Sequence, residues 1–205
     1  MIALIDYRAG NLTSVKKALA TIGAEVFVPE TPGDLATAAG VIVPGVGHFG
    51  ATRALDQPWI DAILARVGEG RPLFGICLGM QWLFEGSDEA PELSGLGLLS
   101  GRCYRLNPQS TIHNPQSLKV PHVGWNSLAI GREGGLLDDV ADGSQVYFTH
   151  SYVAPVTGDT AAITEHGGAF AAVVQRGHIG GVQFHPEKSG DVGLRILRNF
   201  VELAG

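Results

Sequence analysis

Several features that would place a protein in a particular class are missing from this sequence. Its 205 residues include only two cysteines, Cys77 and Cys103, which excludes a disulfide framework. No apolar run is long enough to cross a membrane, and the apolar residues 1–5 lack the basic flank of a signal peptide. The net charge is −6 and the basic residues do not cluster. We therefore expect a cytoplasmic protein that binds neither nucleic acid nor a membrane.

The remaining composition is typical of a compact globule. Hydrophobic residues make up 45% of the chain and charged residues 17%, a balance that argues against a disordered protein. The length suits one domain with a substantial core, and neither an internal repeat nor a long linker divides the chain. We expect a single domain over residues 1–205.

The first half of the sequence alternates between strand-like and helix-like segments. Apolar runs at residues 2–5, 25–28, 41–43 and 72–76 indicate buried strands. Asn11 and Thr13 are both suitable caps for a helix that Gly23 ends. A second helix follows Pro58, and residues 34–39 indicate a shorter helical piece. This alternation predicts an α/β fold with a mostly parallel sheet flanked by helices.

Beyond Gly86 the pattern changes to short strands separated by turns. The candidate strands are residues 101–106, 125–130, 145–153, 160–165, 169–175 and 178–184. They predict antiparallel strands added to the sheet or beside it. Residues 107–121 are rich in Pro, Gln, Ser and Asn and predict a long surface loop. Apolar positions in residues 195–203 predict a closing helix packed on the sheet.

The segment 75–81, Gly-Ile-Cys-Leu-Gly-Met-Gln, has the pattern of a nucleophile elbow. A strand-like run meets Gly-x-Cys-x-Gly and continues as a helix, with cysteine where α/β hydrolases carry serine. Such a turn exposes the Cys77 sulfur at the carboxyl edge of the sheet and at a helix N-terminus, which favours thiolate. The alternative is a buried structural cysteine, the common fate of a lone cysteine in a cytoplasmic protein. Cys103 has no such context and is expected to be a buried hydrophobe.

A candidate partner for this cysteine follows the strand-like residues 181–184. His185 and Glu187 flank Pro186, so a stiff turn holds an imidazole and a carboxylate together at a strand end. A nucleophilic triad needs an imidazole to take and return a proton, and a carboxylate to fix its tautomer. The two motifs together favour catalysis over a structural cysteine.

The segment 44–50 contains a literal G-x-G-x-x-G, the dinucleotide-binding fingerprint. That fingerprint normally follows the first strand of its unit, whereas here the next strand leads to Cys77. We prefer a role in which Gly45 and Gly47 let backbone N–H groups face a developing negative charge, with the Leu78 amide as second donor. The His-x-Glu pair opens the zinc-deaminase signature, but the required Pro-Cys-x-x-Cys is missing. We expect no metal site.

These segments together resemble the class I, triad-type glutamine amidotransferases. The resemblance lies in 44–47 (Pro-Gly-Val-Gly), 75–81 and 182–187 (Val-Gln-Phe-His-Pro-Glu). Segments 6–7, 10–12, 121–126, 147–152 and 187–190 look like those of the glutaminase subunit of imidazole glycerol phosphate synthase. The similarity runs from Asp6 to Phe200. One departure is Arg8, where this family often has glycine.

The resemblance implies a glutaminase that needs no cofactor. Cys77 would attack the glutamine side-chain amide, His185 would transfer the proton and Glu187 would orient the imidazole. Amides at Gly47 and Leu78 would hold the oxyanion. The remaining oxyanion and substrate-binding candidates are Gly45, Gly79, Gln81, His150, Ser151 and Tyr152.

The resemblance also implies a partner, a (β/α)8-barrel cyclase subunit that receives the ammonia in a heterodimer. The cyclase would make imidazole glycerol phosphate and the carboxamide AICAR in histidine biosynthesis. Candidate interface residues are Asn11, Trp125, Asn126, Tyr147 and Lys188. Two alternatives stay open: a glutaminase that feeds another acceptor, such as a vitamin B6 synthase, and a catalytically silent binding subunit.

Overall fold

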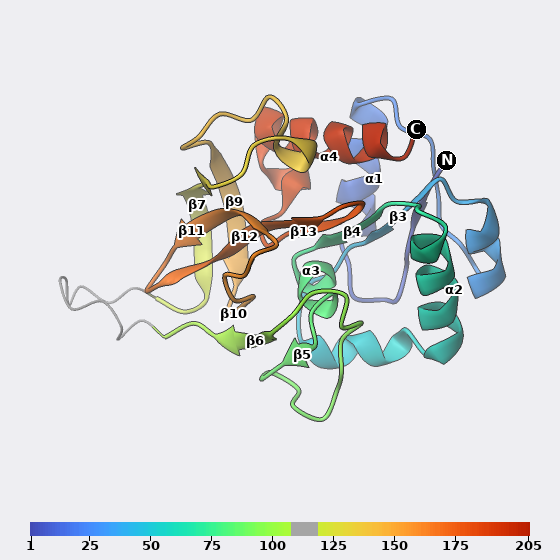
Figure 1. Ribbon diagram of the computed structural model, residues 1–205, viewed down its shortest axis with the longest axis horizontal. Coiled ribbons are helices and arrows are strands. Elements are labelled where there is room, and N and C mark those ends of the chain that lie inside the picture. Colours follow the sequence, from blue (N-terminus) through green and yellow to red (C-terminus); the bar gives the residue numbers. More distant parts are fainter. Residues whose placement is uncertain (108–118) are drawn as a thin grey trace.

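The computed structural model describes residues 1–107 and 119–205, and an eight-stranded sheet lies at its centre. Five neighbouring strands are parallel and three antiparallel strands extend the sheet at one side, in the order β2-β1-β3-β4-β13-β12-β11-β8 (Figure 1). The strands are β1 (Ile2–Leu4), β2 (Val26–Phe27), β3 (Gly40–Val43), β4 (Leu73–Ile76), β8 (Ala129–Ile130), β11 (Thr160–Glu165), β12 (Ala169–Arg176) and β13 (Ile179–Val182). The α/β class and the mainly parallel sheet predicted from sequence are confirmed.

Side-chain alternation along the strands builds a core on each face of the sheet. Ile2 and Leu4 of β1 enter one core and Ala3 and Ile5 the other, as the two-residue period of a strand requires. Helices α1 (Leu12–Thr21) and α4 (Gly190–Leu203) pack against the first face and lie together at the top of Figure 1. Helices α2 (Gln57–Gly68) and α3 (Leu78–Trp82) cover the other face. The 3-10 helices η1 (Pro32–Thr37), η2 (Phe49–Ala54), η4 (Gly135–Leu137) and η5 (Pro186–Lys188) connect these elements.

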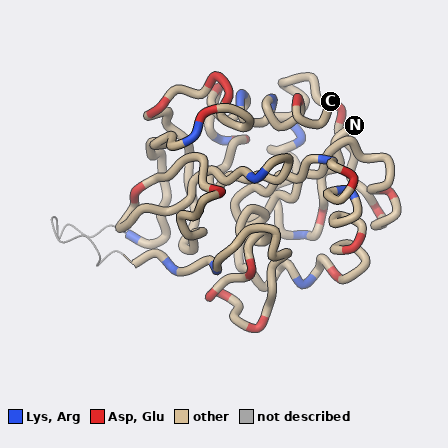
Figure 2. The backbone as a smooth tube through the Cα atoms, viewed as in Figure 1, with Lys and Arg blue, Asp and Glu red and all other residues tan. Residues whose placement is uncertain are grey.

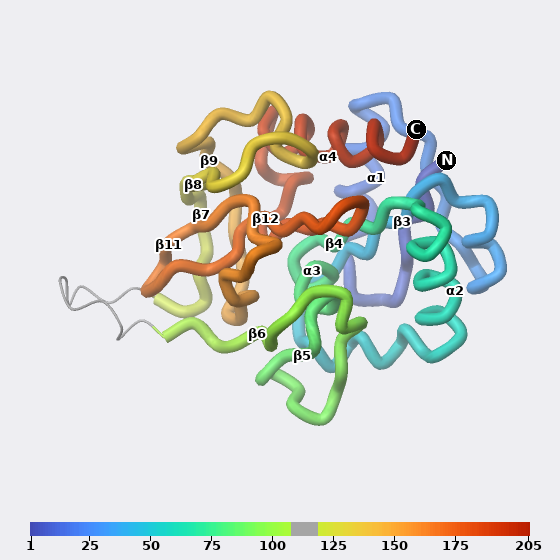
Figure 3. The backbone as a smooth tube through the Cα atoms, viewed as in Figure 1, coloured from blue at the N-terminus to red at the C-terminus, as the bar shows by residue number. Residues whose placement is uncertain are grey.

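The central strands β4 and β13 come from distant parts of the sequence. Figure 3 shows the green β4 beside the orange-red β13 in the middle of the sheet. Their parallel register pairs Ile76 with Val182, so both strands end at the same edge. The residues that follow, Cys77 and Gln183, are therefore neighbours although more than one hundred positions separate them.

Two small sheets flank the main one. The antiparallel ribbon β7 (His122–Ser127) with β9 (Gln145–His150) forms one, and β5 (Gly86–Ser87), β6 (Arg102–Arg105) and β10 (Tyr152–Val153) form the other. The expected strand 125–130 is wrong as a single element, since β7 and β8 belong to different sheets. The expected strand 145–153 is also divided, because β9 pairs with β7 up to His150 and β10 pairs with β6 from Tyr152. The chain changes partners at Ser151.

Other boundaries differ in smaller ways. Helix α4 begins at Gly190, before the first apolar position that sequence periodicity detected, and residues 34–39 fall partly within η1 rather than in an α-helix. Most of the expected loop 107–121 lies outside the described residues. Over the described backbone, Lys and Arg are interspersed with Asp and Glu instead of gathering on one side (Figure 2). Among the helices of residues 1–107 and 119–205, none combines the length and apolarity that crossing a membrane requires.

Candidate active site

Cys77 occupies a sharp turn between β4 and α3. Its backbone has φ 52° and ψ −107°, a conformation that residues with a side chain seldom adopt. Two hydrogen bonds fix the turn: Cys77 N–H donates to the Val182 carbonyl at 2.8 Å, and the Cys77 carbonyl accepts from Gln81 N–H at 3.1 Å. The thiol side chain is 5% exposed. A strained residue held by its surroundings is typical of a functional site.

Close packing around the turn explains two of its glycines. A Cβ atom at Gly79 would collide with the carbonyl of Val43 in β3, and one at Gly75 would lie 2.6 Å from the Gly79 carbonyl. Only glycine lets α3 start so close to the strands beneath it. The short helix therefore begins at Leu78, directly after the cysteine, which is its N-cap residue.

His185 and Glu187 form a buried pair beside the turn. His185 Nδ1 lies 2.9 Å from Glu187 Oε1, and the two side chains are 1% and 2% exposed. Burial alone would lower the pKa of His185, but the neighbouring Cys77 sulfur and the hydrogen bond and charge of Glu187 raise it to about 10. Nδ1 is held by Glu187, whereas the buried Nε2 has no hydrogen-bond partner among the described residues, so it is the ring nitrogen free to exchange a proton with the Cys77 sulfur. A buried imidazole held by a carboxylate beside a cysteine can serve as base and orienting group for a nucleophile.

A cavity of about 330 Å³ opens over the cysteine. It is lined by Gly47, Cys77, Leu78, Gln81, Glu89, Pro121, Thr149, His150, Ser151 and Tyr152. Its walls come from the β3 end, the start of α3 and the β9–β10 junction, so the partner change at Ser151 shapes the site. The volume suits a small molecule.

The glycine segment after β3 lies at the rim of this cavity. Gly47 has φ 90°, which favours glycine, and it lines the cavity. Gly45 does not line it but packs against Tyr7 and Leu78. The Val46 N–H donates to the Ala9 carbonyl at 2.7 Å and is thereby engaged outside the cavity.

The same segment does not fit a phosphate. Phe49 N–H, at the start of η2, donates to the carboxylate of Glu89 at 2.7 Å. In a dinucleotide fold the corresponding N–H groups face an anionic ligand. Here an acidic side chain already occupies that direction, which argues against the dinucleotide interpretation.

Comparisons with known proteins agree with this geometry. The family model "Glutamine amidotransferase class-I" matches residues 3–203. The chain belongs to this family. It also belongs to the narrower family of imidazole glycerol phosphate synthase subunit HisH. Proteins of that name from Moorella thermoacetica and Gloeobacter violaceus are 47% and 48% identical to it, over 98% and 99% of this chain and 94% and 89% of theirs.

The solved structures support the fold. One, described as "Crystal structure of glutamine amidotransferase", superimposes with a TM-score of 0.74 at 23% identity and covers both chains completely. The "Structure of PurLQS from Thermotoga maritima" reaches a TM-score of 0.75 at 17% identity, over 98% of this chain and 97% of that one.

Within this class I amidotransferase, most of the residues predicted for the site converge. Gly47, Leu78, Gln81, His150, Ser151 and Tyr152 line the cavity with Cys77. Gly45 and Gly79 have packing roles next to it. Three further side chains at the site were not named as site residues from the sequence: Glu89, and Gln183 and Tyr7, which lie within the segments that carry the resemblance. Gln183 donates to the Cys77 sulfur at 3.6 Å, and burial followed by the charge of Cys77 raises the pKa of Tyr7.

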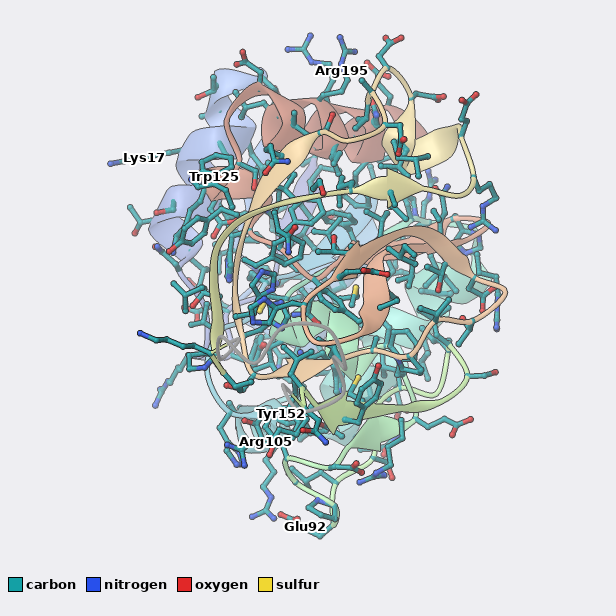
Figure 4. All side chains as sticks on the ribbon, turned by 90° about the vertical axis from the view of Figure 1, so that its left-hand side faces the viewer. Lys17, Glu92, Arg105, Trp125, Tyr152 and Arg195 are labelled. Carbon is teal, nitrogen blue, oxygen red and sulfur yellow. The ribbon has the colours of Figure 1, made fainter. Side chains whose placement is uncertain are left out.

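The candidate interface residues of this amidotransferase form two groups. Trp125, Tyr147 and Lys188 contact one another, whereas Asn126 and Asn11 make hydrogen bonds elsewhere in the chain. The Trp125 and Tyr147 rings meet edge to face at 6.0 Å, and the Lys188 ammonium lies 5.8 Å from the Tyr147 ring centre. Figure 4, which views the molecule from the left-hand side of Figure 1, shows Trp125 in the upper part of the view and Tyr152 well below it. Asn126 instead points to the other side of β7, where it contacts His122. The Asn11 side chain caps α1 by accepting from Ser14 N–H at 3.3 Å.

The structure also bears on Cys103, on possible metal ligands and on Arg8. Cys103 is fully buried, as expected, and burial raises the pKa of its thiol. Within the described ranges 1–107 and 119–205, no group of three or more His, Cys, Asp or Glu side chains could hold a metal ion. Arg8, the departure from the family pattern, has φ 64°, a conformation that glycine adopts more easily.

Proposed function

We propose that residues 1–205 form a single glutaminase domain that hydrolyses glutamine to glutamate and ammonia through Cys77. The observation that carries this proposal is the convergence of a strained cysteine and a buried His185–Glu187 pair at one cavity. Membership of the amidotransferase family supports the same chemistry. We place this activity in the cytoplasm.

The reaction follows from the roles that the geometry allows. With the pKa of His185 raised to about 10, the thiol proton already lies on the imidazole at neutral pH, and the Cys77 thiolate attacks the carbon of the side-chain amide. The imidazolium returns a proton to the leaving nitrogen, so ammonia departs and a γ-glutamyl thioester remains. Water then attacks the thioester with His185 as base, releasing glutamate and regenerating the thiol. Glu187 keeps the imidazole oriented throughout.

Recognition of glutamine would use the walls of the cavity. The Glu89 carboxylate carries the charge that complements the α-ammonium group of an amino acid. Gln81, His150, Ser151 and Tyr152 would surround the rest of the substrate. The Leu78 N–H would be one donor to the oxyanion.

The second oxyanion donor would come from the segment at Gly45 to Gly47. Its Val46 N–H is bound to Ala9 in this structure, which supports a low activity of the isolated chain. Binding of the partner and its ligand would turn a donor of this segment into the cavity. A missing oxyanion donor typically lowers the rate by about 10²- to 10³-fold. High turnover by the purified chain alone would contradict this regulation without affecting the chemistry.

The partner that we propose is a (β/α)8-barrel cyclase. Relatives at 47% and 48% identity are named as subunits of imidazole glycerol phosphate synthase. Free ammonia in neutral water becomes ammonium, which cannot attack, so a dry passage to a second active site is needed. The exposed Trp125, with Tyr147 and Lys188 beside it, offers a surface for such a partner.

Reconstitution with a cyclase tests the proposal. The full chain would co-purify with the cyclase, and the complex would form imidazole glycerol phosphate and AICAR with glutamine as nitrogen source. Cys77→Ala in the same complex would lose the glutamine-dependent reaction and keep the reaction with added ammonia. Activity with a vitamin B6 synthase instead would favour the other acceptor. Cys77→Ala with unchanged glutamine use would favour a silent subunit.

A further inference from the structure

A series of hydrogen bonds connects β7 with the wall of the cavity. Asn126 Nδ2 lies 3.3 Å from His122 Nε2, His122 Nδ1 lies 3.1 Å from His150 Nε2, and His150 Nδ1 lies 3.2 Å from the Tyr152 carbonyl oxygen. We call these four groups the histidine bridge. The antiparallel register places His122 directly opposite His150, which explains how the two rings meet.

The end groups fix the direction of every bond in the histidine bridge. The Tyr152 carbonyl can only accept, so His150 carries its proton on Nδ1. The other nitrogen of a neutral His150 accepts, so His122 must donate from its own Nδ1. His122 Nε2 then accepts from the Asn126 amide. The orientation of that amide is set independently, because its oxygen accepts from Ser127 N–H at 2.8 Å and its nitrogen donates to the Glu165 carbonyl at 3.0 Å.

A second set of side chains continues from the same carbonyl to the nucleophile. Gln81 Nε2 donates to the Tyr152 carbonyl at 2.8 Å and to Gln183 Oε1 at 3.0 Å. Gln183 Nε2 donates to the Cys77 sulfur at 3.6 Å. Both amide side chains are buried, so each depends on these partners.

The surroundings keep both histidines of the bridge uncharged. His122 stacks between Phe148 and His166, with ring centres 4.8 Å and 4.0 Å apart. Burial, followed by the neighbouring His166, lowers the pKa of His122 to about 4. Burial first, then His122, His166 and His185, lowers the pKa of His150 to about 3. A positive charge on either ring would also place two donors against each other.

We propose that His122 is a positioning residue of the glutaminase site, holding His150 and the Tyr152 carbonyl in place while Gln81 and Gln183 extend the connection to the Cys77 sulfur. This inference rests on the proposed glutaminase function. His122 does not line the cavity, so it acts through His150. Replacing its donor leaves His150 Nε2 unsatisfied and frees the cavity wall to move.

The tautomers give a test that does not depend on activity. Long-range 15N–1H correlation spectra of the full chain with labelled histidine report which ring nitrogen carries the proton. We expect both His122 and His150 to carry it on Nδ1 at pH 7 and to stay neutral down to pH 5. A proton on Nε2 of either ring, or titration of either ring near pH 6.5, would overturn the proposed bridge.

Two substitutions at His122 separate positioning from packing. In His122→Asn the amide nitrogen stands near the place of Nδ1 and still donates to His150, whereas His122→Leu has no donor. In the cyclase complex we expect His122→Leu to lower kcat/KM for glutamine about 10-fold, mainly through KM. Interaction energies between residues in one hydrogen-bond network typically change activity by this factor. His122→Asn should stay within about 3-fold of the unmodified complex, as a retained donor implies.

A histidine elsewhere serves as the matched control. His178 is partly buried and its Nε2 lies 2.9 Å from the Val67 carbonyl, outside the bridge. His178→Leu should leave kcat/KM unchanged. Equal losses in His122→Asn and His122→Leu, or no loss in either, would contradict the positioning role. If the unmodified complex hydrolysed no glutamine, the proposed function would fail, while the tautomer measurement would still decide the bridge.

Discussion

At the scale of single residues, the site places strain and charge on a few side chains. Three non-glycine residues, Arg8, Cys77 and Asp139, have positive φ within the described part of the chain, and only Cys77 of these lines the cavity. Its strain is maintained by backbone bonds to β13 and α3. Beside it, His185 depends on Glu187 for both orientation and protonation. The smallest informative changes are therefore those that keep shape and alter charge.

Glu187→Gln is such a change. It keeps the shape of the side chain but removes the charge beside His185 Nδ1. The pKa of His185, raised to about 10 in the structure, should fall, because one of the partners that raise it is lost. The glutaminase rate should fall by about 10²- to 10⁴-fold with little change in KM, as for other orienting carboxylates. An NMR titration of His185 and steady-state kinetics of the cyclase complex measure the two effects. Glu202→Gln, in the exposed last turn of α4, should change neither, and an unaltered His185 titration in Glu187→Gln would contradict the assigned pair.

At the scale of elements, the contact between α3 and the strands decides whether the elbow can form. The helix is only five residues long and would not be stable alone. Its position is set by the missing side chains of Gly75 and Gly79 against β3 and β4. The elbow is thus a property of packing between elements as much as of its own residues.

Gly79→Ala tests this packing. Because the added methyl group would overlap the Val43 carbonyl, we expect the free energy of unfolding to fall by about 1–3 kcal/mol, the usual cost of overpacking. Gly68→Ala is the matched control: it lies at the end of α2 with open space around it and should be neutral or stabilise by up to about 1 kcal/mol. Urea unfolding of each full-length variant measures both. Equal free energies of unfolding for the two variants would contradict the idea that only glycine fits between α3 and the Val43 carbonyl.

The elements show how far sequence reasoning reaches. Apolar runs located β1, β3 and β4, and the Gly-x-Cys-x-Gly pattern located the turn at Cys77, since these signals are local. The division at Ser151 was not predicted, because the sequence 145–153 is continuously strand-like and only the pairing with β6 and β7 interrupts it. Helix α4 starts earlier than periodicity suggested because glycines at 190 and 193 interrupt the apolar positions of its first turns, although Val192 and Leu194 pack against the core.

The residues of the site were, like the strands and helices, predictable only where a local sequence motif marks them. Residues within motifs, such as Cys77, His185 and Glu187, carry a chemical signal of their own. Glu89 and Gln183 became visible only when folding placed them beside Phe49 and the Cys77 sulfur. The pairing of His122 with His150 likewise depends on the register of two strands, which no local pattern specifies.

At the scale of the whole molecule, Trp125 is the residue that a partner would most affect. It is 57% exposed, on the face of β7 opposite to Asn126, and touches Tyr147. We expect Trp125→Ala to keep the fold and to weaken cyclase binding at least about 10-fold, as the loss of an aromatic anchor usually does. Calorimetric titration with the cyclase measures the affinity. Val156→Ala, at another exposed apolar residue (52%), should leave it unchanged, and equal effects of both would contradict a specific surface.

The stability of the whole chain should also depend on pH, with opposite signs for two sets of histidines. The pKa of His122 and His150 is lowered to about 4 and 3 in the folded state, so below pH 6.5 the unfolded chain binds their protons first. The contribution of His122 and His150 to the free energy of unfolding is fully present above pH 6.5, and it is lost as the pH decreases towards 4. The pKa of His185 is raised to about 10, so its contribution is complete below pH 6.5 and is lost as the pH rises towards 10. Stability should therefore be highest near neutral pH.

The acid side of this profile separates the histidine bridge from the carboxylates. Between pH 6.5 and 5, above the range in which carboxylates titrate, each neutral buried histidine can contribute at most about 1.4 kcal/mol per pH unit. His122→Asn removes one titrating ring, so the free energy of unfolding should fall less steeply over this interval even though the variant keeps its donor to His150. Urea unfolding at closely spaced pH values gives the slope for both proteins. The same slope in both would mean that His122 binds its proton equally well in the folded and unfolded states, which a buried acceptor for the Asn126 amide cannot do.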